Sequence, residues 1–178
     1  ALKVLSYNGI KSHVVYPRCC GMPQLEQGDI KRVAENAENT ARELRPFLDR
    51  KIPIVSTVPS CTLMMKSEWP LVLPENKDVK DLSTLTYDVS EFLVQINKDI
   101  GLVPGLNPLE GSVSLHLSCH GRAQNIGAKG AEMLRLIPNA NANVIERCSG
   151  HGGSWGVKKQ NFENAMKFAR GTIRKIKR

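Results

Sequence analysis

The apolar residues of the chain alternate between two kinds of spacing. Short runs rich in β-branched and other apolar residues predict strands at residues 13–17, 52–58, 112–117 and 143–147. Helical spacing predicts helices from about residue 29, at 88–98, at 123–136 and over the C-terminal residues. Residues 71–81 and the proline- and glycine-rich residues 101–111 are predicted to be loops. Strands that alternate with helices predict an α/β fold with a mostly parallel sheet, or sheets, covered by helices.

The first long helix has the clearest sequence signals. Asp29 is a favourable N-cap residue. The apolar stripe after it consists of Ile30, Val33, Ala37, Ala41, Leu44 and Leu48. This spacing predicts that one face of the helix packs against a core.

The five cysteines all lie just past the C-terminal end of a predicted strand. They are Cys19, Cys20, Cys61, Cys119 and Cys148. In an open α/β sheet these strand ends share one edge, where binding sites form. The order of strand, cysteine loop and helix recurs along the chain. It therefore predicts two pseudo-repeated halves, residues 1–105 and 106–178, with cysteine loops at strand ends.

The charge of the chain is concentrated at its C-terminal end. Of the formal net charge of +8, residues 158–178 carry +7. Their apolar residues have helical spacing, so they predict a basic amphipathic helix that packs by one face or meets anionic lipid or an acidic partner. Nucleic acid is disfavoured, because the rest of the chain has no basic patch and no recognisable binding motif.

Composition narrows the class of protein further. Hydrophobic residues at 41% and charged residues at 24% are ordinary for a globular domain. No apolar run approaches the ~18 residues of a transmembrane helix, and Ala1 begins no recognisable signal peptide. An odd number of widely spaced cysteines argues against a secreted disulfide scaffold and for a reducing compartment.

The cysteine loops have the chemistry of a metal site. Thiolates are soft ligands that suit iron–sulfur clusters and zinc. Gly21 and Gly150 adjoin cysteine loops, where backbone N–H groups can approach cluster sulfurs. The adjacent pair Cys19-Cys20 suits a larger cluster better than one tetrahedral zinc ion, whose ligands are usually spaced two or more residues apart.

Other interpretations of these residues stay open. A single cysteine such as Cys61 or Cys119 is often a small buried apolar residue, and Cys19-Cys20 could form a redox-active disulfide. His120 and His151 lie in the cysteine loops and are more often hydrogen-bonding neighbours of a site than ligands. No catalytic nucleophile–base spacing and no phosphate-binding loop occurs.

Four motifs in order resemble a known family. They are CCGMPQLEQGD at 19–29, PSCTLMMKSE at 59–68, CHGRAQNIG at 119–127 and RCSGHGGSWG at 147–156. Together they resemble the cysteine-rich (CCG) domain proteins. That family includes the C subunit of anaerobic glycerol-3-phosphate dehydrogenase, the B subunit of heterodisulfide reductase, and iron–sulfur subunits of glycolate and lactate oxidation.

The resemblance implies an electron-transfer subunit of an oxidoreductase complex rather than a stand-alone catalyst. Cys19, Cys20 and Cys61 would be ligands at one iron–sulfur site, and Cys119 and Cys148 would belong to a second. In heterodisulfide reductase the cluster is a noncubane [4Fe–4S] cluster. The implied partners are a flavin dehydrogenase subunit, other iron–sulfur subunits, and quinone or a disulfide as acceptor. The implied location is the cytoplasm or the inner face of the cytoplasmic membrane.

The chain also departs from the family pattern. Met64 stands where the heterodisulfide reductase pattern has a second cysteine after Cys61, and Cys148-Ser149-Gly150 replaces a second Cys-Cys-Gly. Ferredoxin-type cysteine runs are absent, so the chain is either a fragment of a longer chain, which the family pattern favours, or a degenerate homologue. The second site then needs His120 or His151 to complete it, or holds another metal or none. The alternative function is a zinc-holding or metal-free scaffold module docked by its basic helix.

Overall fold

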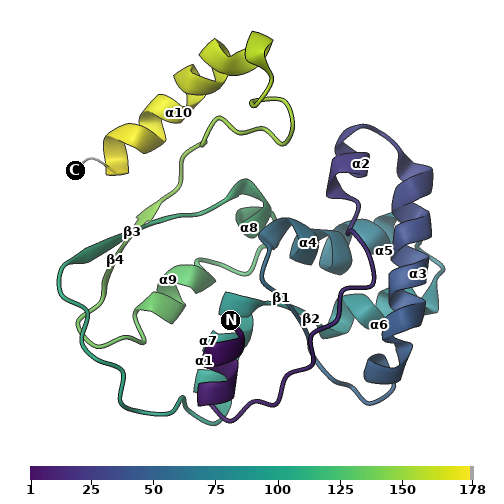
Figure 1. Ribbon diagram of the computed structural model, residues 1–178, viewed down its shortest axis with the longest axis horizontal. Helices are drawn as coiled ribbons and strands as arrows, with labels where there is room; N and C mark the ends of the chain where they lie inside the picture. Colours follow the sequence, from purple (N-terminus) through teal and green to yellow (C-terminus); the bar gives the residue numbers. More distant parts are fainter. Residues whose placement is uncertain (177–178) are drawn as a thin grey trace. The chain divides into compact units, whose positions relative to one another are not determined.

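The computed structural model describes residues 1–176, and it has an α/β fold with two small parallel sheets and helices (Figure 1). The chain divides into two compact units, Ala1–Gly105 (unit 1) and Leu106–Arg178 (unit 2). No helix among residues 1–176 is long and apolar enough to cross a membrane. The pseudo-repeat of two cysteine-rich halves stays a prediction.

Unit 1 is mostly helical around a sheet of two parallel strands, in which Ile54 pairs with Thr86 and Ser56 with Asp88. Its elements are α1 (Leu2–Tyr7), α2 (Met22–Glu26), α3 (Ile30–Leu48), β1 (Ile54–Ser56), α4 (Pro59–Leu63), the π-helical turn η1 (Met64–Glu68), α5 (Trp69–Val72), α6 (Lys77–Leu85), β2 (Thr86–Asp88) and α7 (Val89–Asp99).

The predicted start of α3 is confirmed. The Asp29 side chain accepts a hydrogen bond from the backbone N–H of Arg32, which satisfies one of the unpaired donors of the first turn. The predicted stripe is buried except for Ile30, which is exposed. The core of unit 1 consists of Met22, Val33, Ala37, Ala41, Leu44, Leu48, Leu63, Met64, Met65, Trp69, Val79 and Leu82.

The predicted helix after Asp88 is confirmed as α7. Asp88 and Glu91 form a capping box: the Asp88 side chain accepts from first-turn N–H groups, and Glu91 accepts from the Asp88 backbone. Glu91 also pairs with Lys66 of η1, at 2.7 Å between Nζ and Oε2, with both side chains largely buried. The ion pair therefore ties α7 to the helical run that follows Cys61.

Several element predictions for unit 1 are wrong. Residues 13–17 belong to no strand, although their β-branched composition predicts one. Residues 71–81 hold the end of α5 and the start of α6, because Asn76 caps α6 by accepting from the Val79 N–H. Strand β2 was not predicted, since three residues between two helices carry no periodic signal.

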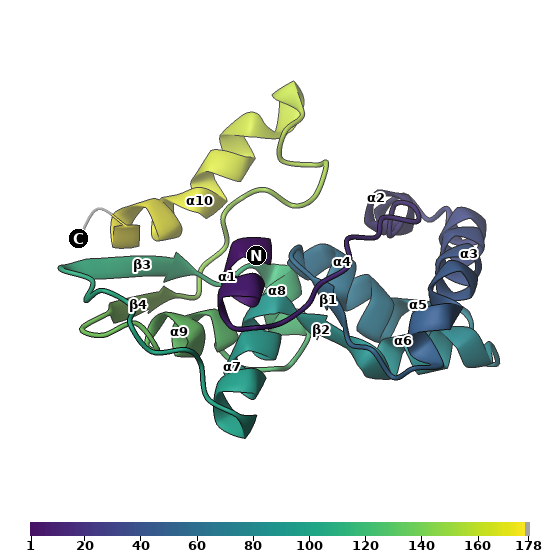
Figure 2. The ribbon, with the colours of Figure 1, turned by 60° about the horizontal axis from the view of Figure 1, so that its bottom comes forward.

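Unit 2 contains the second parallel sheet. Its elements are β3 (Ser112–His116), α8 (Cys119–Ala123), α9 (Lys129–Leu134), β4 (Asn141–Ile145), the 3₁₀ turn η2 (Lys159–Asn161) and α10 (Phe162–Ile176). His116 pairs with Ile145 at the ends of the strands. Figure 2 shows α9 on one side of this sheet and α10 on the other. The single helix predicted at 123–136 is instead the short pair α8 and α9.

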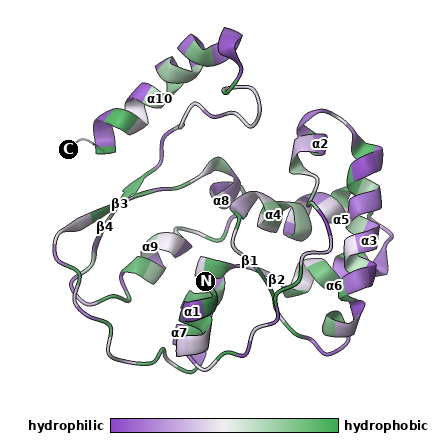
Figure 3. Cartoon of the chain, in the orientation of Figure 1, coloured by the Kyte–Doolittle hydropathy of each residue, from purple (hydrophilic) through white to green (hydrophobic). Residues whose placement is uncertain are grey.

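Helix α10 is the predicted basic amphipathic helix, with Lys177 and Arg178 outside the described residues. Its apolar residues with helical spacing are Phe162, Ala165, Met166, Ala169, Ile173 and Ile176. Ala165 and Ala169 of this stripe are buried, together with Thr172. The larger side chains of the stripe are exposed, Phe162, Met166 and Ile176, as is Phe168 beside it. Figure 3 shows hydrophobic and hydrophilic stretches alternating along α10.

Candidate metal centre

The adjacent cysteines Cys19 and Cys20 lie in the turn that leads into α2. Cys19 is exposed and Cys20 is half-buried. Gly21 is the N-cap residue of α2 with φ of 85°, in the left-handed region that favours glycine. A Cβ at this position would lie 3.5 Å from Cγ2 of Val33 in α3. Gly21 therefore allows the chain to reverse directly after Cys20 and to pack close to α3.

Cys61 lies on α4 and meets Cys20 across unit 1. A hydrogen bond between the two thiols, with burial and Coulombic repulsion adding to it, raises the pKa of Cys20. The same hydrogen bond lowers the pKa of Cys61 to about 7, while burial and the nearby Cys19 oppose the shift. The Met22 N–H and the Cys19 thiol also interact with the Cys20 sulfur and lower its pKa. Of the hydrogen-bonded pair, Cys61 is therefore the thiol that ionises more readily than Cys20.

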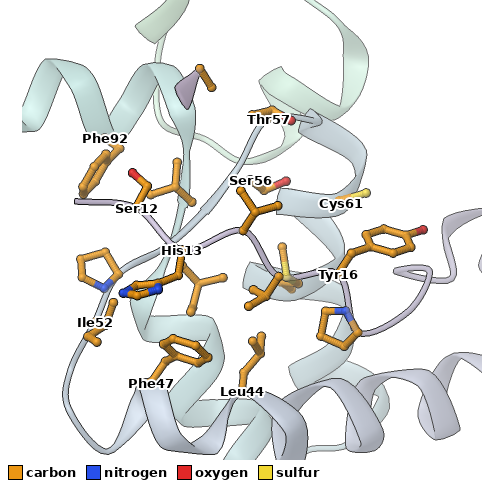
Figure 4. Close-up of a pocket in the computed structure, with 18 of the residues that line it drawn as sticks. Ser12, His13, Tyr16, Leu44, Phe47, Ile52, Ser56, Thr57, Cys61 and Phe92 are labelled. Atoms are coloured by element: carbon orange, nitrogen blue, oxygen red, sulfur yellow. The ribbon is translucent and has the colours of Figure 1, made fainter. Parts of the chain in front are cut away.

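A cavity of about 470 Å³ adjoins these thiols. It is lined by the extended residues 10–18, by residues 52–58 around β1, and by side chains that include Cys20, Cys61 and Trp69. Figure 4 shows His13, Phe47 and Ile52 at one end and Tyr16 and Cys61 at the other. The cavity thus gives Cys20 and Cys61 a largely apolar surrounding on one side.

Cys119 and Cys148 lie in unit 2, each three residues beyond the end of a strand. The strands end side by side, and His116 Nε2 lies 2.7 Å from the carbonyl oxygen of Arg147. Both cysteines are exposed. The Arg122 guanidinium lies 3.9 Å from the Cys119 sulfur, and the Gly150 N–H donates to the Cys148 sulfur at 3.3 Å. Each sulfur of unit 2 thus has a nearby N–H donor.

The loop after Cys148 packs tightly against α10. The Thr172 hydroxyl donates to the Cys148 carbonyl at 2.8 Å. Gly150 has φ of 77°, and a Cβ there would overlap the backbone carbonyl of Ala165. The position therefore requires glycine for two independent reasons. The buried face of α10 is used to hold the Cys148 loop.

The two histidines of the cysteine loops differ in burial. His120 is half-buried within α8, and His151 is exposed, with its backbone carbonyl accepting from Gly156. Among residues 1–176, no group of three or more His, Cys, Asp or Glu side chains is set around one metal position. The assignment of the five cysteines, two histidines and two glycines to a site stays a prediction.

The donor set of unit 1 is compatible with a thiolate-bound group. Cys20 and Cys61 are hydrogen-bonded there and Cys19 interacts with both, the pKa of Cys61 is lowered, and the Met22 N–H interacts with the Cys20 sulfur. These are features that favour bound thiolates and tune iron–sulfur sites. Unit 2 supplies two thiols, which is fewer than a four-ligand site needs.

Sequence reasoning missed Trp69 and Thr172. Each donates a side-chain hydrogen bond to the backbone carbonyl of a cysteine, Cys20 for Trp69 and Cys148 for Thr172. Contacts between segments 49 and 24 residues apart leave no periodic signal in a single sequence. A buried tryptophan, whose N–H needs a partner, was the available hint at Trp69.

Comparison with known protein families gives a match for the N-terminal part of the chain. Residues 1–66 match the model of the cysteine-rich domain family CCG. Over these residues the chain is similar to the CCG-type cysteine-rich domain. The match covers Cys19, Cys20 and Cys61, the thiols that meet in unit 1. The resemblance seen in the sequence motifs is thereby confirmed.

The curated relatives extend over more of the chain. It is 28% identical over 162 residues to the C subunit of anaerobic glycerol-3-phosphate dehydrogenase from Escherichia coli, covering 89% of this chain and 40% of that protein. Lactate utilization protein A of Lysinibacillus sphaericus is 29% identical, over 83% of this chain and 65% of its own. The B subunit of fumarate reductase (CoM/CoB) from Methanothermobacter marburgensis is 28% identical, over 88% and 29%. The chain thus spans less than two thirds of the length of these relatives, and no solved structure matches it significantly.

Proposed function

We propose that this CCG-domain protein is an iron–sulfur electron-transfer subunit of an oxidoreductase complex. The observation that carries the proposal is the meeting of Cys19, Cys20 and Cys61 in a family-matched domain. Relatives named as subunits of a dehydrogenase and of a reductase support the same role. The electron donor proposed from these names is a flavin dehydrogenase subunit of the glycerol-3-phosphate type, with other iron–sulfur subunits as neighbours.

The residues of unit 1 have separate tasks in this proposal. A bound iron–sulfur cluster, of [4Fe–4S] type and noncubane as in heterodisulfide reductase, supplies one-electron transfer. Cys61 provides a thiolate more readily than Cys20, because the pKa of Cys61 is lowered to about 7. Cys19 and Cys20 supply two further sulfurs from adjacent positions. The apolar wall beside Cys20 and Cys61 limits water at the thiolates and thereby tunes the potential.

A second site in unit 2 is proposed at Cys119 and Cys148. Both follow paired strands, and N–H donors approach their sulfurs. His120 or His151 is proposed to complete the ligand set, with Gly150 keeping the loop close to α10. In the longer proteins of the family, residues outside this chain are an equally good source of the missing ligands.

The metal proposal is tested by purification without oxygen. We expect iron and acid-labile sulfide in the folded chain, with a paramagnetic signal on reduction. A folded protein that contains no iron after anaerobic preparation and reconstitution would overturn the proposal. Stoichiometric zinc without visible absorption would favour the alternative function, a zinc-holding scaffold module.

Quinone as the acceptor and peripheral attachment to the inner face of the cytoplasmic membrane complete the proposal. Helix α10 is the proposed attachment surface. It exposes Phe162, Met166 and Ile176, and carries Lys167, Arg170, Arg174 and Lys175 among them. Apolar side chains interleaved with cations are typical of helices that lie in an anionic lipid interface.

Membrane attachment predicts a salt-sensitive binding curve. The chain should bind phosphatidylglycerol vesicles more strongly than phosphatidylcholine vesicles, and binding should weaken from 0.1 M to 1 M salt, since the screening length falls from ~10 Å to ~3 Å. Cosedimentation measures this directly. The pair Arg170→Gln with Arg174→Gln should reduce binding, whereas Lys31→Gln with Arg50→Gln, the same charge change in unit 1, should not. Equal loss in both double variants would contradict a role of α10.

A further inference from the structure

Trp69 connects the two cysteine loops of unit 1. Its indole Nε1–H donates to the backbone carbonyl of Cys20 at 3.0 Å, across 49 residues of sequence. The side chain is 1% exposed and belongs to the core of the unit. A buried hydrogen bond of this kind fixes the acceptor in position, because a lost partner would leave a buried polar group unsatisfied.

The carbonyl that accepts from Trp69 lies where the first cysteine loop turns into α2. It belongs to Cys20, and the next residue, Gly21, takes the left-handed conformation from which α2 begins. A change in the ψ angle of Cys20 would move the Met22 N–H relative to the Cys20 sulfur with which it interacts. The hydrogen bond from Trp69 therefore restrains the backbone at the cysteine itself.

Trp69 is also rigidly joined to the second loop. Residues 59–72 form one continuous helical run of α4, η1 and α5, with Cys61 in its first part and Trp69 at the start of α5. Eight residues of regular α-helix would turn Trp69 about 80° away from Cys61. The π-helical turn takes up one extra residue, so the pair behaves as if seven residues apart and lies within about 20° around the axis.

The two cysteines and Trp69 border a common cavity. Cys20, Cys61 and Trp69 all line the same cavity of about 470 Å³. The helical run positions Cys61 and Trp69 on one face, and Trp69 in turn holds Cys20 by its carbonyl. Trp69 thus binds the backbone of one cysteine and shares a helical run with the other.

We propose that Trp69 is a positioning residue that holds Cys20 at the distance from Cys61 needed by a shared thiolate-bound group. The inference rests on the proposed function for the nature of that group, while the positioning of the thiols stands on the hydrogen bond alone. Without the indole N–H, the Cys20 turn gains freedom and its sulfur becomes more accessible.

The test uses the reduced, metal-free full chain and limiting iodoacetamide, with labelling of each cysteine followed by peptide mass spectrometry. Trp69→Phe should raise the labelling rate of Cys20 about 2- to 10-fold, the factor that one hydrogen bond supplies. Cys148 in the same chain should react at an unchanged rate. Trp155→Phe is the matched control, since Trp155 lies in unit 2 and is 40% exposed.

A second substitution removes the risk that Trp69→Phe only loosens the core. In the Trp155→Phe background, the remaining tryptophan is replaced by β-(3-benzothienyl)alanine, which keeps the indole shape and has sulfur in place of the N–H. The proposal expects faster labelling of Cys20 with an unchanged thermal unfolding midpoint. Labelling of Cys20 at the rate of the Trp155→Phe parent would overturn it, whatever Trp69→Phe does.

Iron reconstitution separates this inference from the proposed function. If the parent chain binds iron, both variants should shift its paramagnetic spectrum or midpoint potential while Trp155→Phe leaves them unchanged. An unshifted spectrum and potential in both variants would overturn the role of Trp69. A parent chain without iron would overturn the proposed function but leave the labelling result decisive for Trp69.

Discussion

Replacing Cys61 by serine is expected to abolish iron binding in unit 1. The pKa of Cys61 is lowered to about 7, so this thiol is more readily available as a thiolate than its hydrogen-bonded partner Cys20. Serine nearly conserves the side-chain volume, and Cys61 is only half-buried, so the fold should persist. The loss is therefore attributable to the ligand and should appear as loss of the iron, sulfide and visible absorption that unit 1 contributes.

The matched control is Cys119→Ser in unit 2. It is an equally conservative replacement of a thiol, and that thiol belongs to the other compact unit of the chain. We expect Cys119→Ser to retain the unit 1 spectrum and Cys20→Ser to lose it. Full iron and sulfide with an unchanged paramagnetic signal in Cys61→Ser would contradict the assignment of Cys61 as a ligand.

The parts of the fold that the sequence predicted are those with local causes. Helices α3 and α7 start where Asp29 and Asp88 cap them, and an acidic N-cap ahead of an apolar stripe is visible in a single sequence. The strands β3 and β4 were found for a similar reason, although β4 begins two residues earlier than predicted. Their β-branched runs are bounded by polar or glycine residues.

The missed parts depend on long-range contacts. Residues 13–17 have strand composition but make no strand pairing, and pairing is a tertiary property. Strand β2 exists because Thr86–Asp88 meets β1, three residues that no periodicity marks. In α10 the helical spacing correctly marked Ala165 and Ala169 as buried, but it did not show that Phe162, Met166 and Ile176 on the same stripe would be exposed.

The candidate site likewise has residues that the sequence identified and contacts that only the folded chain shows. The cysteines could be identified because the sequence gives both their residue type and their positions after predicted strands. The contact between Cys20 and Cys61, and the hydrogen bonds from Trp69 and Thr172, join residues that are distant in sequence. A sequence can thus name the donors of a metal site while the residues that position them emerge only from the folded chain.

Gly150→Ala should have the largest effect on stability in unit 2. The new Cβ would overlap the Ala165 carbonyl and lie 3.3 Å from the Ala169 Cβ, on a residue whose φ is 77°. Left-handed strain and overpacking together cost about 2–6 kcal/mol. Since α10 buries Ala165, Ala169 and Thr172, the expected result is detachment of this helix from the Cys148 loop.

Gly111→Ala separates strain from overlap, because Gly111 also has a positive φ, 87°, but no atom within 4 Å of the added Cβ. It should cost only the conformational strain, about 1–3 kcal/mol. Denaturant unfolding gives the two costs, and hydrogen exchange locates them: Gly150→Ala should accelerate exchange along α10, and Gly111→Ala should not. Loss of the Thr172 hydrogen bond should also make Cys148 label faster in Gly150→Ala alone. Equal costs and equal α10 exchange in the two variants would show that the helix does not hold the Cys148 loop.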